Sequence, residues 1–98
     1  EDRYRIAATS PMKIDVIKRL LAKHAGEPTL IIGQYLDQIH TIADALQMPM
    51  ITGETPVDER ERLFELFRTG AITTLVVSKV ANFSIDLPEA SVAIQISG

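Results

Sequence analysis

The turn from Gly53 to Asp58 has the residue types of a phosphate-binding site. The apolar run Met50-Ile51-Thr52 leads into Gly53, and Thr55-Pro56-Val57-Asp58 has the pattern of a capping box with proline at the first helical position. A glycine between a strand and a helix exposes backbone N–H groups near the positive end of the helix dipole, where a phosphate can bind and Thr55 can add a hydroxyl donor. Many α/β proteins use such a turn with nothing bound, so a plain turn is the alternative interpretation.

Residues 78–88 form a second candidate, a loop between two strand-like runs. Its polar residues are interleaved with apolar ones: Ser78, Lys79, Asn82, Ser84 and Asp86 alternate with Val80, Phe83, Ile85 and Leu87. Polar groups on an apolar-anchored loop at strand ends suit a segment that grips a ligand. The alternative is a plain crossover whose apolar residues plug the edge of the sheet, and the residues alone favour neither interpretation.

Other patterns exclude several kinds of chemistry. No Gly-x-x-x-x-Gly-Lys-Ser/Thr or Gly-x-Gly-x-x-Gly run is present, so the chain has no complete nucleotide-binding motif of its own. The run Asp58-Glu59-Arg60-Glu61 is similar to the acidic motif that holds magnesium in ATPases, but it begins an amphipathic helix instead of following an apolar strand. Cysteine is absent, and His24 and His40 lie on different predicted helices with no carboxylate cluster beside them, which argues against a metal centre.

The charge balance and the apolar pattern narrow the class of protein further. The 98 residues include ten basic and thirteen acidic side chains, for a net charge of −3, which excludes a module that binds nucleic acid by bulk electrostatic attraction. Apolar runs of at most about five residues exclude a membrane span. The chain has no initiator methionine and no apolar leader, so we expect a fragment of a longer protein without a signal peptide.

Helices and strands must position these candidates. Helical periodicity and end signals predict three helices, between Ser10-Pro11 and Gly26, from Leu36 to Pro49, and from Thr55 to Gly70. Apolar runs predict strands at Tyr4–Ala8, Thr29–Ile32, Met50–Thr52, Thr73–Val77 and Ser91–Ile96. This alternation predicts an α/β fold, a parallel sheet flanked by helices on both faces, with ligands at the carboxyl ends of the strands. That rule also directs attention to Gly33–Asp37.

Three runs late in the chain strongly resemble motif V and the following strand of XPB-type helicases, which are DNA-repair and transcription-associated members of helicase superfamily two. The runs are Thr74–Val80, Ser84–Ala90 and Val92–Ser97. Their pattern of Ser-Lys-Val, then Ser-x-Asp-Leu-Pro-Glu-Ala, then Ile-Gln-Ile-Ser separates this branch from the DEAD-box RNA helicases. Thr29–Asp37 is similar to motif IV, and Gly53–Arg60 is similar to the segment after the next strand.

The resemblance implies that residues 1–98 are a partial second RecA-like domain that spans motifs IV to V and lacks motif VI. In the strand order it implies, Thr29–Ile32 lies between Met50–Thr52 and Thr73–Val77, followed by Ser91–Ile96 and then Tyr4–Ala8 outermost. A first RecA-like domain of the same polypeptide would carry the phosphate loop and the magnesium-binding acids. ATP and Mg²⁺ would bind between the two domains, and this chain alone is not expected to hydrolyse ATP because the arginines of motif VI are absent.

The resemblance assigns contacts with the DNA backbone to two segments. Ser78 matches the motif V hydroxyl that faces the nucleic-acid backbone, and Lys79 beside it would add a phosphate contact. Gly53 and Thr55 match a turn whose amides hold a backbone phosphate. Because contacts with the backbone carry no base information, binding would be independent of DNA sequence.

The resemblance also assigns contacts with the nucleotide and one further contact with DNA. Asp86 matches the acid that accepts hydrogen bonds from the ATP ribose, and Ser84 stands in the same nucleotide-binding segment where many relatives have glycine. Arg60 matches the arginine of a Gln-x-x-Arg pattern that binds DNA, although Val57 replaces the glutamine.

The resemblance therefore predicts part of an ATP-dependent DNA helicase or translocase. Its partners would be DNA, the first RecA-like domain, and repair or transcription proteins, with no membrane. It would act in the cytoplasm at the nucleoid of a prokaryote or in the nucleus of a eukaryote. Two alternatives stay open: a stand-alone α/β protein-interaction module that binds no nucleotide, and the equivalent domain of an RNA helicase.

Overall fold

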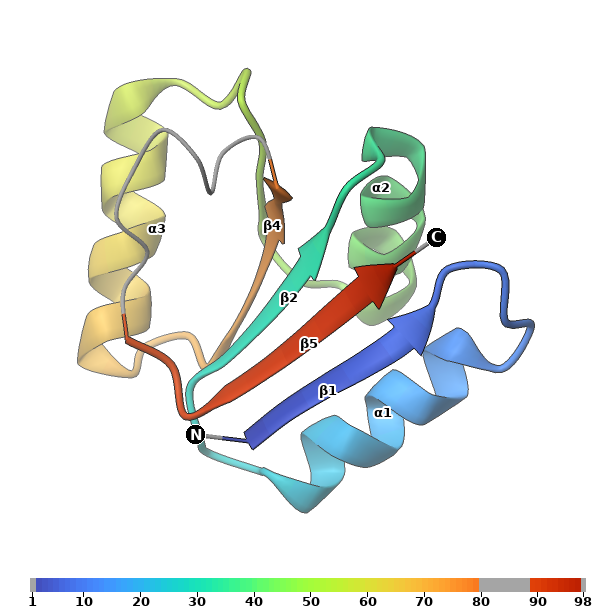
Figure 1. Ribbon diagram of the computed structural model, residues 1–98. Coiled ribbons are helices and arrows are strands. Elements are labelled where there is room, and N and C mark those ends of the chain that lie inside the picture. The colour runs from blue at the N-terminus through green and yellow to red at the C-terminus, as the bar shows by residue number, and fades with distance from the viewer. Residues whose placement is uncertain (1, 80–88, 98) are drawn as a thin grey trace.

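Strands and helices alternate along most of the chain, as the sequence predicts. The computed structural model describes residues 2–79 and 89–97. Its elements are β1 (Asp2–Ala7), α1 (Lys13–Lys23), β2 (Thr29–Gly33), α2 (Leu36–Leu46), β3 (Met50–Ile51), α3 (Val57–Thr69), β4 (Thr74–Ser78) and β5 (Val92–Ser97). Figure 1 shows them wound into one layered unit in which the strands run side by side. Every helix and strand expected from the periodicity is present.

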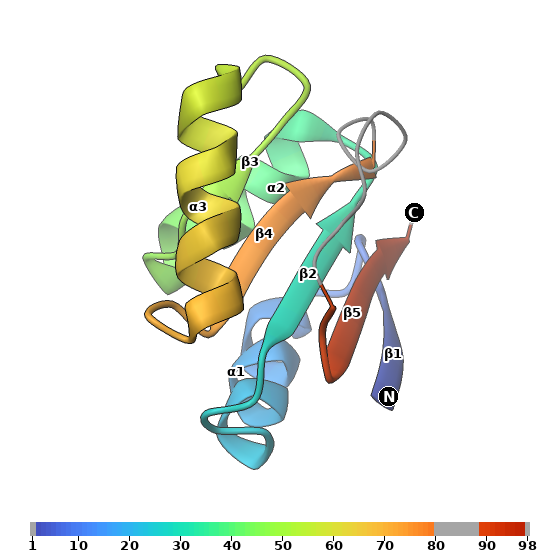
Figure 2. The same cartoon turned by 90° about the vertical axis from the view of Figure 1, so that its left-hand side faces the viewer.

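The strands form one parallel, five-stranded sheet in the order β1-β5-β2-β4-β3. Helices α1 and α2 pack on one face and α3 packs on the other, which is visible when Figures 1 and 2 are compared. The expected α/β class, a parallel sheet with helices on both faces, is confirmed.

The strand order implied by the family resemblance is wrong at two places. Strand β2 pairs with β4 and β5 and not with β3, and β5 lies between β1 and β2 instead of beside β4. Strand β3 has only two residues, so it supplies too few hydrogen bonds for a central position and lies at the edge, paired with β4. Strand β5 buries Val92, Ile94 and Ile96 on one face, where they join the core cluster that includes residues of α1 and α2.

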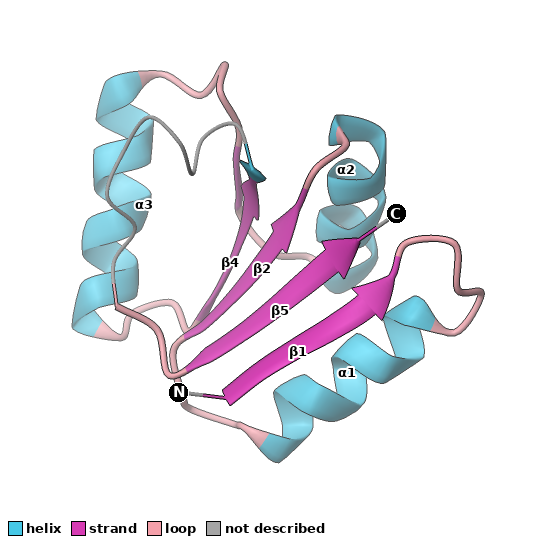
Figure 3. Ribbon diagram, viewed as in Figure 1, coloured by secondary structure: helices cyan, strands magenta, loops and turns pink. Residues whose placement is uncertain are grey.

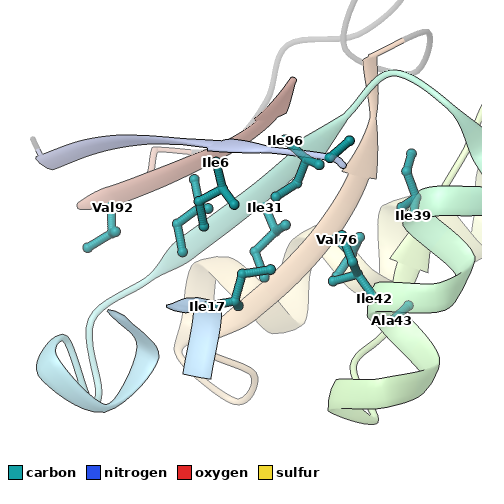
Figure 4. Packing of buried hydrophobic residues seen from close by; sticks show 11 residues of the cluster. Ile6, Ile17, Ile31, Ile39, Ile42, Ala43, Val76, Val92 and Ile96 are labelled. Atoms are coloured by element: carbon teal, nitrogen blue, oxygen red, sulfur yellow. The ribbon is translucent and has the colours of Figure 1, made fainter. Parts of the chain in front are cut away.

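One half of the core lies between the sheet and helices α1 and α2. Ile17 of α1 and three residues of α2 project toward the sheet, where they meet alternate residues of the strands (Figure 4). The α2 residues recur every three or four positions, which places them on one face of the helix: Ile39, Ile42 and Ala43. Their partners from the sheet include Ile6, Ile31, Val76, Val92 and Ile96.

The other half of the core lies under α3. Leu63, Phe64 and Phe67 form the buried stripe of this helix, and they pack on residues from β2, β3 and β4. All five residues of β4 are buried, which fits a strand covered on both faces. The α3 side of β5 and β1 differs, because Gln95 is only half-buried and Arg5 is exposed there, with no helix of the described residues packed on them.

Two predicted helix caps are wrong because their hydroxyl groups bond elsewhere. Helix α1 begins at Lys13 with Met12 as its N-cap residue, and the Ser10 hydroxyl accepts a hydrogen bond from the Met12 backbone N–H at 3.3 Å. Helix α3 begins at Val57 with Pro56 as its N-cap residue and no side-chain cap. Hydroxyl side chains often bond to nearby backbone in turns, which competes with capping.

His24 has carboxylates beside it, contrary to the expectation from the sequence. This buried residue follows α1, and its Nδ1 lies 2.8 Å from a carboxylate oxygen of Glu27 and 3.8 Å from one of Asp2. Its Nε2 lies 2.8 Å from the Tyr4 hydroxyl of β1. His24 therefore links α1 to the edge strand β1, at the opposite end of the sheet from the carboxyl ends of the strands.

Candidate nucleic-acid interface

The carboxyl ends of β2, β3 and β4 lie side by side. Gly33 at the end of β2 pairs with Ser78 at the end of β4, and Ile51 of β3 pairs with Val77. The segments that follow these strands border a cleft of about 310 Å³, lined by Gln34, Leu36, Thr52, Gly53, Glu54 and Ser78. Two residues predicted from different segments of the sequence, Gly53 and Ser78, thus share one cleft.

The turn after β3 is held by its own hydrogen bonds. The Thr52 N–H donates to the Thr55 hydroxyl at 2.9 Å, and the Glu54 N–H donates to the Thr52 hydroxyl at 3.2 Å. The Thr55 N–H donates to the Thr52 carbonyl at 3.2 Å. Two of the amides expected for a phosphate are therefore used inside the turn, whereas the Gly53 N–H makes no hydrogen bond within the described chain. The Thr55 hydroxyl accepts one bond and keeps a proton to donate.

Of the other predicted DNA contacts, Ser78 lines the cleft, whereas Lys79 and Arg60 are not among its described lining residues. Ser78 is buried at the end of β4, and Lys79 follows it as a half-buried residue. Arg60 lies on α3, three and four positions before Leu63 and Phe64, so it continues the inward stripe of this helix toward the carboxyl edge of the sheet. Among the described residues its buried Nε has no hydrogen-bond partner. An unsatisfied buried donor is costly, so a rearrangement of Arg60 that brought it to an acceptor such as a phosphate oxygen would be favourable.

Helices α2 and α3 both begin at this edge, and neither has a side-chain cap (Figure 3). The first amides bonded within these helices are those of Ile39 and Arg60, so the N–H groups before them point outward without helical partners. Such termini favour anions. Asp37, Asp58 and Glu59 in the first turns offset part of this positive potential.

Two carboxylates lie near this edge, Glu59 on α3 and Glu54 in the turn after β3. Arg62 donates hydrogen bonds to both carboxylate oxygens of Glu59, at 2.7 and 3.1 Å, and this lowers the pKa of Glu59 below its usual value. Glu54 lines the cleft itself. A phosphate at the Gly53 turn would therefore meet a carboxylate of the same sign.

We expect the substitution Glu54→Gln to strengthen binding of single-stranded DNA by about two- to fivefold at low ionic strength, because it removes a repulsive charge from the cleft. Fluorescence anisotropy with the full-length protein at low and high salt measures the effect. The exposed Glu61 on α3 gives a matched control, Glu61→Gln. An affinity gain of the same size in both variants, or a gain that persists at high salt, would contradict a phosphate at this cleft.

The resemblance assigns contacts with the nucleotide to two residues of the segment 80–88. Ser84 and Asp86 lie outside the described residues. In the portion that the structure describes, no group of three or more histidine and carboxylate side chains has the arrangement of a metal site. No described helix is long and apolar enough to cross a membrane.

Four lining residues were not predicted as site residues from the sequence: Gln34, Leu36, Thr52 and Glu54. The rule that ligands bind at strand ends pointed to Gly33–Asp37 as a segment, but no side chain in it had an obvious chemical role. For Gln34 and Leu36 the available signal was position alone, directly after an apolar run that ends at glycine.

All 98 residues match the family model described as the ERCC3/RAD25/XPB C-terminal helicase. The chain is 63% identical over 98 residues to DNA 3′-5′ helicase XPB of Kineococcus radiotolerans and 59% identical over 98 residues to DNA 3′-5′ helicase XPB of Mycobacterium tuberculosis. Each match covers 100% of this chain and 18% of the relative. A subunit of Antonospora locustae, the "General transcription and DNA repair factor IIH helicase/translocase subunit XPB", is 40% identical over 95 residues, which cover 94% of this chain and 14% of the relative.

Proposed function

This chain belongs to the ERCC3/RAD25/XPB C-terminal helicase family, and from that premise we propose that it is part of the second motor domain of an ATP-dependent DNA helicase or translocase. The chain spans less than a fifth of the length of the relatives cited above, so the activity belongs to a larger protein. We extend to it the 3′-5′ polarity in the names of two of them. Their names also specify DNA, which favours DNA over RNA and over a stand-alone interaction module.

The observation that supports this function most is the meeting of Gly53 and Ser78 in one cleft at the carboxyl edge. The unpaired Gly53 N–H would donate to a phosphate oxygen, and the Ser78 hydroxyl would contact the same backbone. Lys79 and Arg60 would add positive charge beside the DNA strand. The Thr55 hydroxyl would add a hydrogen-bond donor at the turn. These groups carry no base information, so the grip would be independent of sequence.

Nucleotide binding would involve residues outside the described chain. We propose that Asp86 accepts hydrogen bonds from the ATP ribose and that Ser84 borders it, with the phosphates and Mg²⁺ held by the first RecA-like domain. ATP hydrolysis would supply the free energy that opens and closes the two domains. The role of the present residues would be to hold the DNA backbone in one state and release it in another.

We also propose partners and a location for the larger protein. One relative is named as a subunit of a general transcription and DNA repair factor, so we propose that repair or transcription proteins bind the larger protein. We propose that it acts at the nucleoid of a prokaryotic cell or in the nucleus of a eukaryotic cell.

Steady-state ATP turnover of the full-length protein, measured against both DNA and ATP concentration, tests these roles together. We expect Ser78→Ala to raise the DNA concentration for half-maximal stimulation about five- to tenfold, because one hydrogen bond to a charged group is lost. Asp86→Ala should instead raise the KM for ATP. Ser91→Ala, at the amino end of the sheet, should change neither.

Each outcome separates one role from another. If Ser78→Ala and Ser91→Ala give the same DNA dependence, the backbone contact of Ser78 is wrong. If Asp86→Ala leaves the KM for ATP unchanged, the ribose contact is wrong. If DNA does not stimulate turnover of the unmodified protein at all, the proposed motor function itself fails.

A further inference from the structure

Exposed large hydrophobic side chains gather at the edge of the sheet that holds the cleft. In the portion of the chain that is described, they are Met12 (47% exposed), Tyr35 (46%), Leu36 (46%) and Val57 (61%). Each one lies at the start of a helix, as an N-cap residue or as the first helical residue. Each described helix begins after a parallel strand has ended, so the helix starts lie at the carboxyl edge of the sheet (Figure 3). Isolated exposed hydrophobics such as Met12 are ordinary, but the adjacent pair Tyr35 and Leu36 at the cleft points to a contact surface.

Two of these side chains lie at the cleft. Leu36 precedes the buried Ile39 by three positions, so it extends the inward stripe of α2 one turn beyond the sheet. There it lines the same cleft as Gly53 and Ser78. Tyr35 comes directly before it in extended backbone, between the lining residues Gln34 and Leu36. No hydrogen bond of the Tyr35 hydroxyl to another described residue holds its ring in place.

We propose that Tyr35 and Leu36 form a platform for the bases of the DNA strand whose backbone lies in the cleft. This inference rests on the proposed function and deepens it, because it adds contact with base faces to contact with phosphates. An aromatic ring stacks on any base, since every base has a π-face, and an aliphatic side chain covers the next ring edge. Such contacts strengthen binding to single strands without reading their sequence.

The chemistry of the cleft favours a base over a second phosphate at this position. On the α2 side of the cleft, Asp37 in the first turn of α2 offsets the positive potential of the helix start. A phosphate beside this carboxylate would be repelled, whereas a neutral, planar base would remove apolar surface of Tyr35 and Leu36 from water. The backbone therefore fits the Gly53 side of the cleft and the bases fit the α2 side.

Paired single strands of equal length and charge test the platform: an oligothymidine, and a strand of the same length built from abasic sites. Affinities of the full-length protein are measured by fluorescence anisotropy at one salt concentration. We expect Tyr35→Ala to weaken binding of the oligothymidine about five- to tenfold and to change binding of the abasic strand less than about twofold. Tyr35→Phe should bind both strands as the unmodified protein does, because the ring is kept.

Two controls separate this inference from the proposed function. Met12→Ala removes a side chain of equal exposure beside the distant edge strand β1 and should leave both affinities unchanged. Ser78→Ala should weaken binding of both DNA strands alike. If it does not, the proposed contact of Ser78 with the DNA backbone is wrong, whereas the platform is unaffected. If Tyr35→Ala lowers the affinity for both DNA strands equally, or lowers neither, the platform is wrong. Reduced ATP turnover without DNA, combined with unchanged DNA affinity, would assign Tyr35 to a contact between domains and overturn it as well.

Discussion

Replacing Phe67 with alanine is expected to lower the free energy of unfolding of the domain by about 3–5 kcal/mol. Phe67 is fully buried and packs between α3 and the sheet with Leu63 and Phe64. In the described chain α3 is the helix that covers this face, so no second helix can move into the cavity that the substitution leaves. Domains of this size have only about 5–15 kcal/mol of stability in total, so most of it would be lost.

Urea denaturation followed by circular dichroism measures this loss. Val57→Ala serves as the control on the same helix, because Val57 is 61% exposed and its truncation should change stability by less than about 0.5 kcal/mol. A loss of under about 1 kcal/mol for Phe67→Ala would mean that α3 does not pack on the sheet as described. The midpoint and the slope of the transition should both be compared, since a changed slope would indicate a changed denatured state.

Gly33→Ala is expected to destabilise the domain by about 1–3 kcal/mol through overpacking. A Cβ added at Gly33 would lie 2.9 Å from Cγ1 and 3.5 Å from Cδ1 of Ile39, and 3.9 Å from Cβ of Ile96. Ile39 belongs to α2 and is buried against the sheet. Relief of the clash requires a change of the Ile39 side chain or a shift of α2 away from the sheet, and such a shift would carry Leu36 out of the cleft.

A double-mutant cycle isolates this clash. Ile39→Ala alone should cost about 2–5 kcal/mol, because it leaves a cavity. It also removes the atoms that the new Cβ would strike, so Gly33→Ala combined with Ile39→Ala should be less destabilised than the sum of the single variants by about 1 kcal/mol or more. Additive effects would show that close approach at Gly33 is not what constrains α2. DNA affinity should fall with Gly33→Ala for the same geometric reason.

The local elements were predictable because their signals are local. The stripe of Leu63, Phe64 and Phe67 followed by Gly70 predicts a helix and its end, and Gly70 indeed has a φ of 82°. The unalternating apolar run of β4 predicts a strand covered on both faces, and all of its residues are buried. Such patterns depend on a few neighbouring residues, so the sequence contains them in full.

The strand order and the helix starts depend on longer-range or competing interactions. The residues from Val92 to Ser97 do not indicate that β5 pairs with β1 and β2. That pairing depends on which faces of the sheet the helices cover. Thr55 fits a cap by pattern, yet its hydroxyl bonds to the Thr52 N–H in the turn. Backbone N–H donors in the turn and in the helix compete for one Thr55 hydroxyl oxygen, and the spacing of residues cannot rank them.

The candidate site was predictable by segment and only partly by residue. Glycine and serine at strand ends identified Gly53 and Ser78, which share the cleft. Leu36 was missed because a leucine at helical spacing is normally core, and only the length of α2 relative to the sheet exposes it. The unpartnered Nε of Arg60 was likewise invisible in the sequence, since burial without a partner is a property of packing.

The position of β5 between β1 and β2 has a consequence for biosynthesis. Every ladder pair of β1 joins residues roughly 90 positions apart, so β1 has no ladder partner in this sheet until β5 has been made. Roughly 60 residues separate the end of β2 from the start of β5, and at typical translation rates their synthesis takes about 3–12 s. During that interval β1 and the β5-facing edge of β2 would lack their ladder partner, and such unpaired backbone groups can pair with strands of other chains.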